Sequence, residues 1–350
     1  MRALIFRGPN DYSVEEKPIP QIGEGEMLLK IIACGLCGTD VKVFGNGHRA
    51  ITPPRTTGHE IVGTVAESKS DKAGVVKGDN VLVVAPIGCM KCSFCLRGEQ
   101  NICPVVVEKV HAFGYDTDGG FAEYLLIPKE AAEQGVLIKI PETEIPLTLL
   151  AVAEPLACVL NGQEKLRIGP DDVVVVIGAG PIGSMNVIAA RAEGAKKIIL
   201  ADIDSAKLAL ASVVHPDVSV DSSKENLVER VRKETDGRGA DVVIVAAPAP
   251  ALQTEAIEMA AVRARVSFFA GLAKGTVSPI IDTNKIHYWE IEVYGAFGAC
   301  RKQYEKAMQL IISRPADFQA LVTHTMPLGD IKKAVDLMKT GQTIKVVIAP

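Results

Sequence analysis

The middle of the chain alternates between short apolar runs and longer segments with the periodicity of an amphipathic helix. Residues 173–177 read VVVVI, a β-branched run typical of a strand that is buried on both faces of a parallel sheet. Apolar residues then recur at positions 182, 185, 188 and 189, on one helix face, before a glycine at 194. A second apolar run, KIILAD, covers 197–202. The pattern predicts a strand–helix–strand unit.

The same alternation continues to residue 272. Segments 226–240 and 251–262 are predicted to be helices, and segments 241–247 and 265–272 are predicted to be strands. Strands that alternate with helices are typical of an α/β fold with a doubly wound parallel sheet. The sequence therefore predicts a Rossmann domain over residues 154–293.

The flanking regions have a different pattern. Residues 1–153 contain short strand-like runs separated by glycine and proline. Residues 294–350 contain two helical patterns and end in a strand-like run, IKVVIAP. We expect this tail to rejoin the first region, so that 1–153 and 294–350 form one β-rich domain. A chain of 350 residues is also too long for one ordinary core and suits two domains.

A glycine motif lies between the first predicted strand and its helix. Gly178, Gly180 and Gly183 form the pattern G-x-G-x-x-G, which allows a tight turn and a close approach of the backbone to a pyrophosphate. Asp202 ends the next strand, where a carboxylate accepts hydrogen bonds from an adenosine ribose and repels a 2′-phosphate. This combination predicts NAD in preference to NADP. The residues expected to bind the cofactor are Gly178, Gly180, Pro181, Ile182, Gly183 and Asp202.

Half of the chain's eight cysteines lie within residues 88–104. Cys89, Cys92, Cys95 and Cys103 have the spacing C-x2-C-x2-C-x7-C, and Gly98 supplies a bend before the last of them. Four thiolates with this spacing can close a tetrahedron around zinc at about 2.3 Å per bond, which leaves no open position. We predict a structural zinc lobe; an iron–sulfur cluster, which also takes four thiolates, is the alternative.

Composition limits the classes of partner and compartment. The net charge of −4 gives no basic surface for nucleic acid or an anionic membrane. No apolar run approaches the roughly 18 residues that span a bilayer, and the first residues lack the apolar segment of a signal peptide. We therefore expect a cytoplasmic protein, in which stable disulfides are rare. A homodimer or homotetramer is the general expectation for such a chain.

A second group of metal-ligating residue types is spread along the chain. A catalytic zinc takes about three protein ligands and keeps one position open for water or substrate. A lone histidine is usually structural. The interpretation of this group as a metal site is supported by the predicted dinucleotide-binding domain in the same chain. The candidates are Cys37, Thr39 and Asp40 in ACGLCGTD, His59 and Glu60 in TGHEIVG, and Glu154 in AEPLACVLNG.

These motifs together resemble the zinc-containing medium-chain alcohol/polyol dehydrogenase family, and the EPLA segment resembles its sorbitol (L-iditol 2-) dehydrogenase-like branch. The resemblance covers essentially the whole chain and implies that the β-rich domain has a GroES-like fold. The segments that carry it are CGTD (37–40), GHE (58–60), the four-cysteine lobe, DGGFAEY (118–124), EPLACVLNG (154–162) and GAGPIG (178–183).

The resemblance also implies roles for single residues. Cys37 and His59 would be ligands of a catalytic zinc, and Glu60 and Glu154 compete for the third protein position. A zinc-bound alcohol would lose its proton and pass hydride to the nicotinamide. The Thr39 hydroxyl would either pass the alcohol proton outward or form a hydrogen bond with the backbone of its own turn. The chain would hold two zinc ions and NAD.

The sequence also departs from the resemblance at two positions. Family members commonly carry a relay histidine where this chain has Lys42, and sorbitol enzymes carry a substrate-contacting arginine where it has Gly298. These departures leave the identity of the substrate open. The expected class is a secondary alcohol of a polyol, sugar or sugar phosphate. L-threonine is an alternative substrate, and a non-catalytic NAD-binding sensor is an alternative function.

The remaining candidates receive weaker interpretations. His48, Arg49 and Arg55 form a loop near the expected active site, which either binds a substrate phosphate or is simply solvated. Most other histidines and cysteines are expected to be structural or surface residues: His111, His215, His287, His324, Cys34, Cys158 and Cys300.

Overall fold

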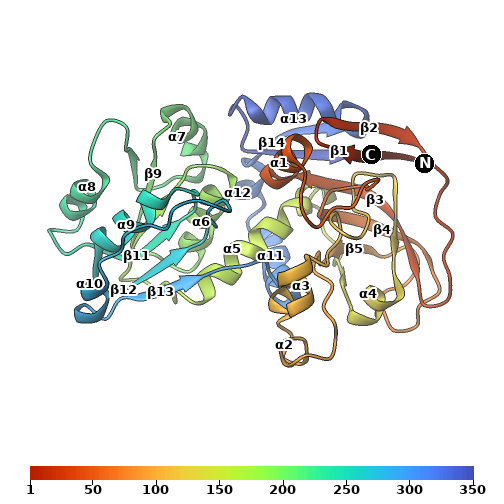
Figure 1. Ribbon diagram of the computed structural model, residues 1–350, viewed down its shortest axis with the longest axis horizontal. Helices are drawn as coiled ribbons and strands as arrows, with labels where there is room; N and C mark the ends of the chain where they lie inside the picture. The colour runs from red at the N-terminus through yellow and green to blue at the C-terminus, as the bar shows by residue number, and fades with distance from the viewer. The chain divides into compact units, whose positions relative to one another are not determined.

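The computed structural model describes all 350 residues, which form two compact units. The first unit contains Met1–Ala157 and Gly298–Pro350, and the second unit contains Cys158–Phe297 (Figure 1). These boundaries lie four residues after those expected from the sequence pattern, at 153/154 and 293/294. None of the helices is both long and apolar enough to cross a lipid bilayer.

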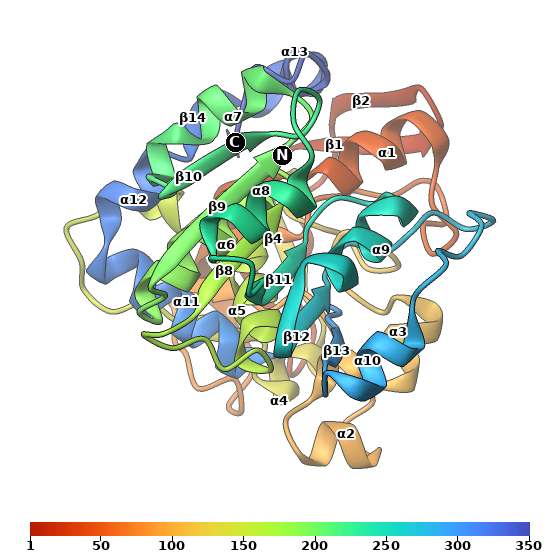
Figure 2. The ribbon, with the colours of Figure 1, turned by 90° about the vertical axis from the view of Figure 1, so that its left-hand side faces the viewer.

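The second unit contains a six-stranded parallel sheet with the strand order β10-β9-β8-β11-β12-β13 (Figure 2). The predicted α/β class with a doubly wound sheet is thereby confirmed. Its strands are β8 (Val173–Ile177), β9 (Lys197–Asp202), β10 (Val218–Asp221), β11 (Ala240–Val245), β12 (Ala260–Phe268) and β13 (Glu292–Gly295). Its helices are α6 (Pro181–Ala192), α7 (Ser205–Ala211), η3 (Ser212–Val214), α8 (Leu227–Glu234), α9 (Pro250–Met259) and α10 (Thr283–Tyr288).

The strand order of this sheet explains where its binding loops lie. The chain passes from β8 to β9 on one side and later returns to β11 on the other side of β8. In such sheets ligands bind beyond the carboxyl ends of the strands at the point where the direction of winding changes. The glycine turn after β8 lies at this point. Aliphatic side chains of the central strands, such as Val175, Ile199 and Val243, are fully buried beneath the helices.

The first unit is built on a mostly antiparallel sheet with the order β14-β15-β3-β4-β5-β7, in which β6 also pairs with β3. The strands of this sheet are β3 (Met27–Leu36), β4 (Glu60–Ser68), β5 (Asn80–Val83), β6 (Tyr124–Ile127), β7 (Leu137–Lys139), β14 (Val322–Pro327) and β15 (Lys345–Ala349). A separate two-stranded sheet contains β1 (Arg2–Gly8) and β2 (Asp11–Glu16). The C-terminal strand β15 pairs with β3, so the tail belongs to the same sheet as the N-terminal region.

The helices of the first unit are short and lie around this sheet. They are α1 (Gly38–Asn46), α2 (Ser93–Leu96), η1 (Gln100–Ile102), α3 (Pro104–Lys109), α4 (Lys129–Gln134), η2 (Leu147–Val152), α11 (Arg301–Ser313), α12 (Pro315–Gln319), η4 (Leu328–Asp330) and α13 (Ile331–Lys339). The helix α5 (Ala153–Glu164) begins in the first unit and carries Glu154 in its first turn.

The pairing of β3 with β4 places the candidate ligands together. These strands are antiparallel, and Gly35 near the end of β3 lies opposite Glu60 at the start of β4. Cys37 follows the end of β3, and His59 precedes the start of β4. Because an antiparallel pair brings the end of one strand to the start of the next, residues 22 positions apart meet at one edge of the sheet.

Candidate active site

Cys37 occupies the N-cap of α1 in a capping box. Its Sγ accepts a hydrogen bond from the Thr39 amide at 3.4 Å, and the Asp40 carboxylate accepts one from the Cys37 amide at 2.9 Å. The sulfur of Cys37 thus lies at the N-terminus of α1, within reach of the free N–H groups of its first turn. The contact of Thr39 that the structure shows is thus made by its backbone.

His59 is buried among groups that favour positive charge on its ring. Its Nδ1 lies 3.8 Å from Oδ1 of Asp40, and its ring centroid lies 5.4 Å from that of Tyr115. Burial acts to lower the pKa of His59, but Tyr115, Asp40 and Cys37 outweigh this effect and hold the pKa well above its ordinary value. An environment that stabilises a cation at this imidazole also suits a metal cation.

Glu60 is fully buried and forms an ion pair with Lys345 on β15. Lys345 Nζ donates to Glu60 Oε1 at 2.6 Å and to the Leu36 carbonyl at 3.2 Å. Glu60 Oε2 lies 2.5 Å from the same nitrogen but accepts no hydrogen bond. Burial acts to lower the pKa of Lys345, and the nearby charges of Glu60, Cys37 and Glu154 raise it above its ordinary value.

Gly35 makes room for this carboxylate. A Cβ atom at Gly35 would lie 1.8 Å from Glu60 Oε2, so every other residue type at this position would displace the Glu60 side chain. Neither Gly35 nor Lys345 was identified from the sequence. The available signal was Lys345 itself, a lone cation in the apolar run IKVVIAP, because a charge in a buried strand requires an opposite charge.

The structure brings three metal-ligating groups together. One ligand atom each from Cys37, His59 and Glu60 lie within 4.8 Å of one another. Glu154 lies in the first turn of α5 and acts on this site by charge, since it raises the pKa of both Tyr115 and Lys345. A thiol, an imidazole and a carboxylate are donor types that zinc binds, and here the carboxylate is also the ion-pair partner of Lys345.

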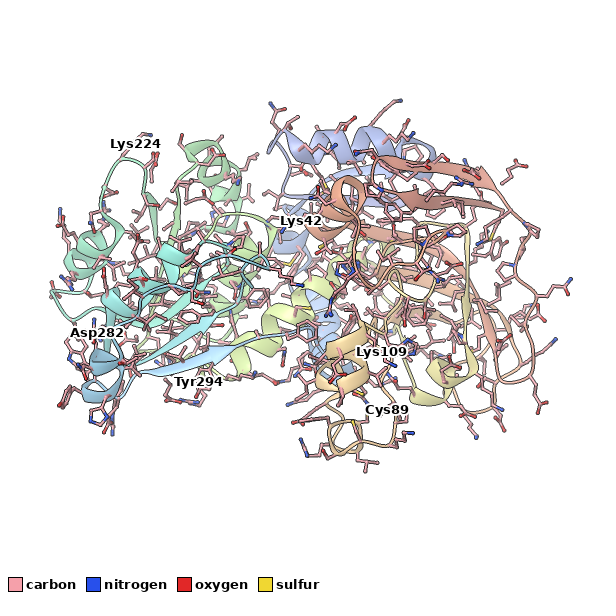
Figure 3. All side chains as sticks on the ribbon, viewed as in Figure 1. Lys42, Cys89, Lys109, Lys224, Asp282 and Tyr294 are labelled. Carbon is pink, nitrogen blue, oxygen red and sulfur yellow. The ribbon has the colours of Figure 1, made fainter.

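The four cysteines of the lobe also converge. The sulfur atoms of Cys89, Cys92, Cys95 and Cys103 lie within 4.8 Å of one another, and all four cysteines are free thiols. Figure 3 labels the first of them, Cys89. Cys92 caps α2 by accepting from the Cys95 amide at 3.4 Å, and Cys103 accepts from the Cys89 amide at the same distance. Gly98 has a φ of +79°, as the predicted bend requires.

The lobe favours thiolate at some of its sulfurs. Hydrogen bonds from the amides of Lys91 and Cys92 lower the pKa of Cys89 to about 6. Burial, followed by the neighbouring Cys92, raises the pKa of Cys95 to about 12. Four cysteine sulfurs this close together are the donor set of a closed, four-thiolate metal site.

The double substitution Cys89→Ser/Cys92→Ser is expected to remove one of two bound zinc ions and to lower the free energy of unfolding by several kcal/mol, because metal binding to such a lobe contributes directly to folding. Elemental analysis and denaturant unfolding measure both effects. Cys158→Ser, outside both clusters, is the matched control and should keep two zinc ions. Iron in the purified protein would contradict the zinc assignment.

The glycine turn of the second unit is closely packed. Gly178 has a φ of +112°, and a Cβ atom at Gly183 would lie 1.6 Å from the Gly178 carbonyl oxygen. Helix α6 begins directly after it, with Gly180 as its N-cap and Pro181 and Ile182 in the first turn. The Asp202 carboxylate accepts hydrogen bonds from the amides of Ala179 and Asp204, at 2.8 and 3.0 Å. Asp202 therefore lies against the turn that is expected to bind the pyrophosphate.

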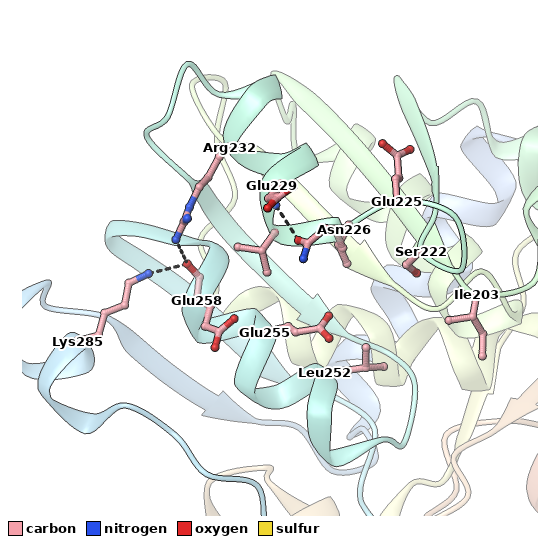
Figure 4. Close-up of a pocket in the computed structure, with 12 residues that line it drawn as sticks. Ile203, Ser222, Glu225, Asn226, Glu229, Arg232, Leu252, Glu255, Glu258 and Lys285 are labelled. Atoms are coloured by element: carbon pink, nitrogen blue, oxygen red, sulfur yellow. Dashed lines mark hydrogen bonds between the residues drawn. The ribbon is translucent and has the colours of Figure 1, made fainter.

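A cavity of about 560 Å³ is lined in part by Ile203, the residue that follows Asp202 (Figure 4). Ile203 and Leu252 line it together with the acids Glu225, Glu229, Glu255 and Glu258. The two basic residues of the cavity are Arg232 and Lys285. Both side chains donate to the backbone carbonyl of Glu258, at 3.4 and 2.7 Å. The acidic side chains thus dominate the charge that faces a ligand here.

The loop arginines form contacts of their own. Arg55 pairs with Asp118 at 3.2 Å, and the exposed Arg49 donates to the Val107 carbonyl at 3.4 Å. Lys42 is exposed on α1 (Figure 3). Cys34 and Cys300 are buried, as expected, whereas His111 has a partner that the sequence did not suggest, Asp116 at 2.6 Å. Arg55 is thus paired with an acid, whereas the contact of Arg49 is to a backbone carbonyl.

Comparisons with known proteins identify the domains and the family of this chain. Residues 23–142 match the alcohol dehydrogenase GroES-like domain, and residues 181–313 match the zinc-binding dehydrogenase domain. An L-threonine 3-dehydrogenase of Caldanaerobacter subterraneus subsp. tengcongensis is 35% identical, over 96% of this chain and 95% of the relative. A sorbitol dehydrogenase of Halalkalibacterium halodurans is 32% identical, over 100% of this chain and 99% of the relative.

A solved structure is similar over the whole chain. A zinc-binding dehydrogenase of Sinorhizobium meliloti, bound to NADP, has a TM-score of 0.88 and 28% identity, and the match covers 100% of this chain and 99% of that one. These matches confirm the GroES-like and Rossmann domains and the enzyme class. The chain belongs to the zinc-containing medium-chain alcohol/polyol dehydrogenase family.

Proposed function

We propose that the protein transfers hydride between a secondary alcohol of an unphosphorylated polyol or sugar and NAD, with a catalytic zinc held by Cys37, His59 and a glutamate. The observation that carries the proposal is the convergence of one ligand atom each from Cys37, His59 and Glu60 within 4.8 Å. Membership of a dehydrogenase family makes an enzyme the conclusion in place of the non-catalytic NAD-binding sensor.

Each residue has a distinct part in this proposal. Zinc, when bound, supplies a Lewis acid for the alcohol oxygen, and the nicotinamide accepts hydride. The Thr39 amide at the start of α1 donates to the Cys37 sulfur and holds it in place, and Asp40 lies beside His59 and helps to orient it. Thr39, two residues after Cys37, is the proposed exit for the alcohol proton. Glu60 is the third ligand by distance, whereas Glu154 acts from α5 on the open side of the site.

The ion pair of one loop arginine favours an unphosphorylated substrate. Arg55 is held by Asp118 at 3.2 Å, whereas Arg49 donates only to the Val107 carbonyl, at 3.4 Å. L-threonine is the second candidate substrate, because an L-threonine 3-dehydrogenase is 35% identical to this chain. The test is NADH formation over polyols, their phosphates and L-threonine, with zinc measured on the same protein. A zinc-loaded protein that oxidises none of these would contradict the proposal.

The preference for NAD is proposed from charge. Asp202 and the acidic cavity beside Ile203 would face a 2′-phosphate, and like charges in a partly buried site repel. Asp202→Asn keeps one acceptor oxygen for the turn and removes the charge. We expect the ratio of kcat/KM for NAD over NADP to fall by about tenfold or more. Asp204→Asn, at the N-cap of α7, is the control. Equal kcat/KM for both cofactors in the unmodified protein would refute the assignment.

A further inference from the structure

A second cavity lies within the first unit and is separate from the proposed metal site. Its volume is about 250 Å³, below the range of roughly 300–1,000 Å³ that is usual for drug-sized ligands, so it suits a molecule of a few heavy atoms. Its wall comes from the loop after β2, the loop before β4, the turn 116–119 and the strand β6. None of the three converging candidate zinc ligands lines it, so zinc would not hold a ligand here.

Two cations of this wall share a single acid. Lys17 Nζ lies 3.4 Å from Oδ2 of Asp118, and Arg55 Nη1 lies 3.2 Å from its Oδ1. Both distances exceed the length of about 2.7–2.9 Å that is usual for a hydrogen bond between a cation and a carboxylate. Oδ1 also accepts from the Thr56 amide at 3.1 Å. One carboxylate is thus divided among three donors, and both cations keep N–H groups for a further acceptor.

The other acid of the wall does not supply that acceptor. Asp116 Oδ2 lies 2.6 Å from Nδ1 of His111, and its Oδ1 accepts from the Ala112 amide at 3.0 Å. Neither partner belongs to the lining of the cavity. The carboxylate of Asp116 is therefore committed to other groups and forms no ion pair with Lys17 or Arg55.

Two buried donors beside these contacts also lack an acceptor. They are Nε of Arg55 and the hydroxyl of Thr56, a residue that is only 2% exposed. A buried donor without an acceptor costs free energy, and native proteins contain few such groups. Both residues line the cavity. Donors therefore outnumber acceptors in this part of the wall, which favours a ligand that carries acceptor oxygens.

Apolar residues form most of the remaining lining. They favour a hydrocarbon group by the hydrophobic effect and offer the hydroxyls of a polyol no side-chain partner. The cavity thus joins a donor-rich part to an apolar part. The apolar contributors are Pro20, Ala122, Leu125, Leu126, Pro128 and the ring of Tyr124.

The turn in this wall continues to the proposed metal site. The Gly114 amide donates to the Thr117 carbonyl at 2.8 Å. A Cβ atom at Gly114 would lie 2.7 Å from the carbonyl oxygen of Gly58, the residue before His59. Tyr115 follows directly, and its ring centroid lies 5.4 Å from that of His59. The cavity and the metal site are therefore distinct but share one short, closely packed turn.

We propose that this cavity binds a small organic carboxylate, with its oxygens at Lys17 and Arg55 and its hydrocarbon part against the apolar wall. A carboxylate is planar and can accept two parallel hydrogen bonds from a guanidinium, so it supplies the acceptors that these donors lack. Arg55 serves this cavity in place of a substrate at the metal. The inference goes beyond the proposed function and does not depend on it, because no candidate zinc ligand lines the cavity.

The test varies the charge of a ligand at nearly constant shape. Ligand-observed NMR titrations of the zinc-loaded protein give dissociation constants for butyrate, butyramide and butylammonium. We expect butyrate to bind saturably and at least about tenfold more tightly than the other two, because only butyrate carries an anionic acceptor. Cys37→Ala protein should keep this binding. Inorganic phosphate, an anion without a hydrocarbon part, should bind more weakly than butyrate.

Substitutions in the wall should have effects of opposite sign. Lys17→Met and Arg55→Met, which each remove one cation, should raise the dissociation constant of butyrate about tenfold. Asp118→Asn, which removes the competing charge and keeps one acceptor for the Thr56 amide, should lower it several-fold. Lys77→Met, at an exposed lysine of the same unit outside the cavity, is the matched control and should leave it unchanged.

Several results would overturn the inference without affecting the proposed hydride transfer. They are the absence of saturable butyrate binding, equal binding of butyrate and butyramide, and tighter binding of phosphate than of butyrate. Binding that is lost in Cys37→Ala protein but kept in Lys17→Met protein would place the carboxylate on the catalytic zinc and also overturn it. If Arg55→Met protein does not fold, Lys17→Met and Asp118→Asn decide the question, because they should change the affinity in opposite directions.

Discussion

Replacement of Cys37 or His59 by alanine should reduce alcohol oxidation by at least about a thousandfold, because loss of the metal removes several kcal/mol of stabilisation from the developing alkoxide. NAD binding should persist, since the glycine turn and Asp202 lie in the second unit, whereas both ligands lie in the first. Zinc content, NAD affinity and turnover are measured on the same preparations. Cys34→Ala, a buried neighbour outside the ligand set, is the control for packing.

Glu60 and Glu154 should differ in their effects on zinc occupancy and turnover in the same experiment. Glu60→Gln is expected to lower zinc occupancy, because Glu60 lies within ligand distance of Cys37 and His59. Glu154→Gln is expected to lower kcat with zinc retained, because Glu154 lies outside the converging ligand set and acts on its neighbours by charge. Glu123→Gln, which breaks an exposed pair with Arg2, should change neither. Normal turnover by Cys37→Ala/His59→Ala protein would contradict the zinc mechanism as a whole.

The parts of the site that the sequence predicted are local in the chain. The turn from Gly178 to Gly183 and the lobe from Cys89 to Cys103 bring their residues together within a few turns of backbone, so spacing alone carries the information. The alternation of apolar runs and helices likewise predicted the doubly wound sheet. The residues of the glycine turn and of the cysteine lobe meet through local backbone structure, without long-range packing.

The parts that the sequence did not predict depend on strand register and on long-range packing. Lys345 reaches Glu60 across 285 positions because β15 pairs with β3, and β3 pairs with β4. Gly35 matters only because it lies opposite Glu60 in that register. Tyr115 reaches His59 because the glycines of two separate loops allow their backbones to touch. Such pairings follow from the whole sheet, and no local spacing encodes them.

Lys345→Met should destabilise the metal-free protein by about 3–5 kcal/mol, because it leaves the carboxylate of Glu60 buried without its cation. The methionine keeps the length of the side chain, so the loss reports charge more than packing. Denaturant unfolding measures the change in free energy. Lys72→Met, which breaks an exposed pair with Glu133, is the matched control and should cost less than about 1 kcal/mol.

The same substitution tests whether Glu60 contacts the metal. If Glu60 is a zinc ligand together with Cys37 and His59, bound zinc provides a second cation beside its carboxylate. The cost of Lys345→Met should then be smaller in the zinc-loaded protein than after chelation. The four-cysteine lobe also loses its metal on chelation, but it does so in both proteins, so its contribution cancels in the difference. An equal cost in the two states would place Glu60 outside the reach of the zinc and leave Glu154 as the carboxylate ligand.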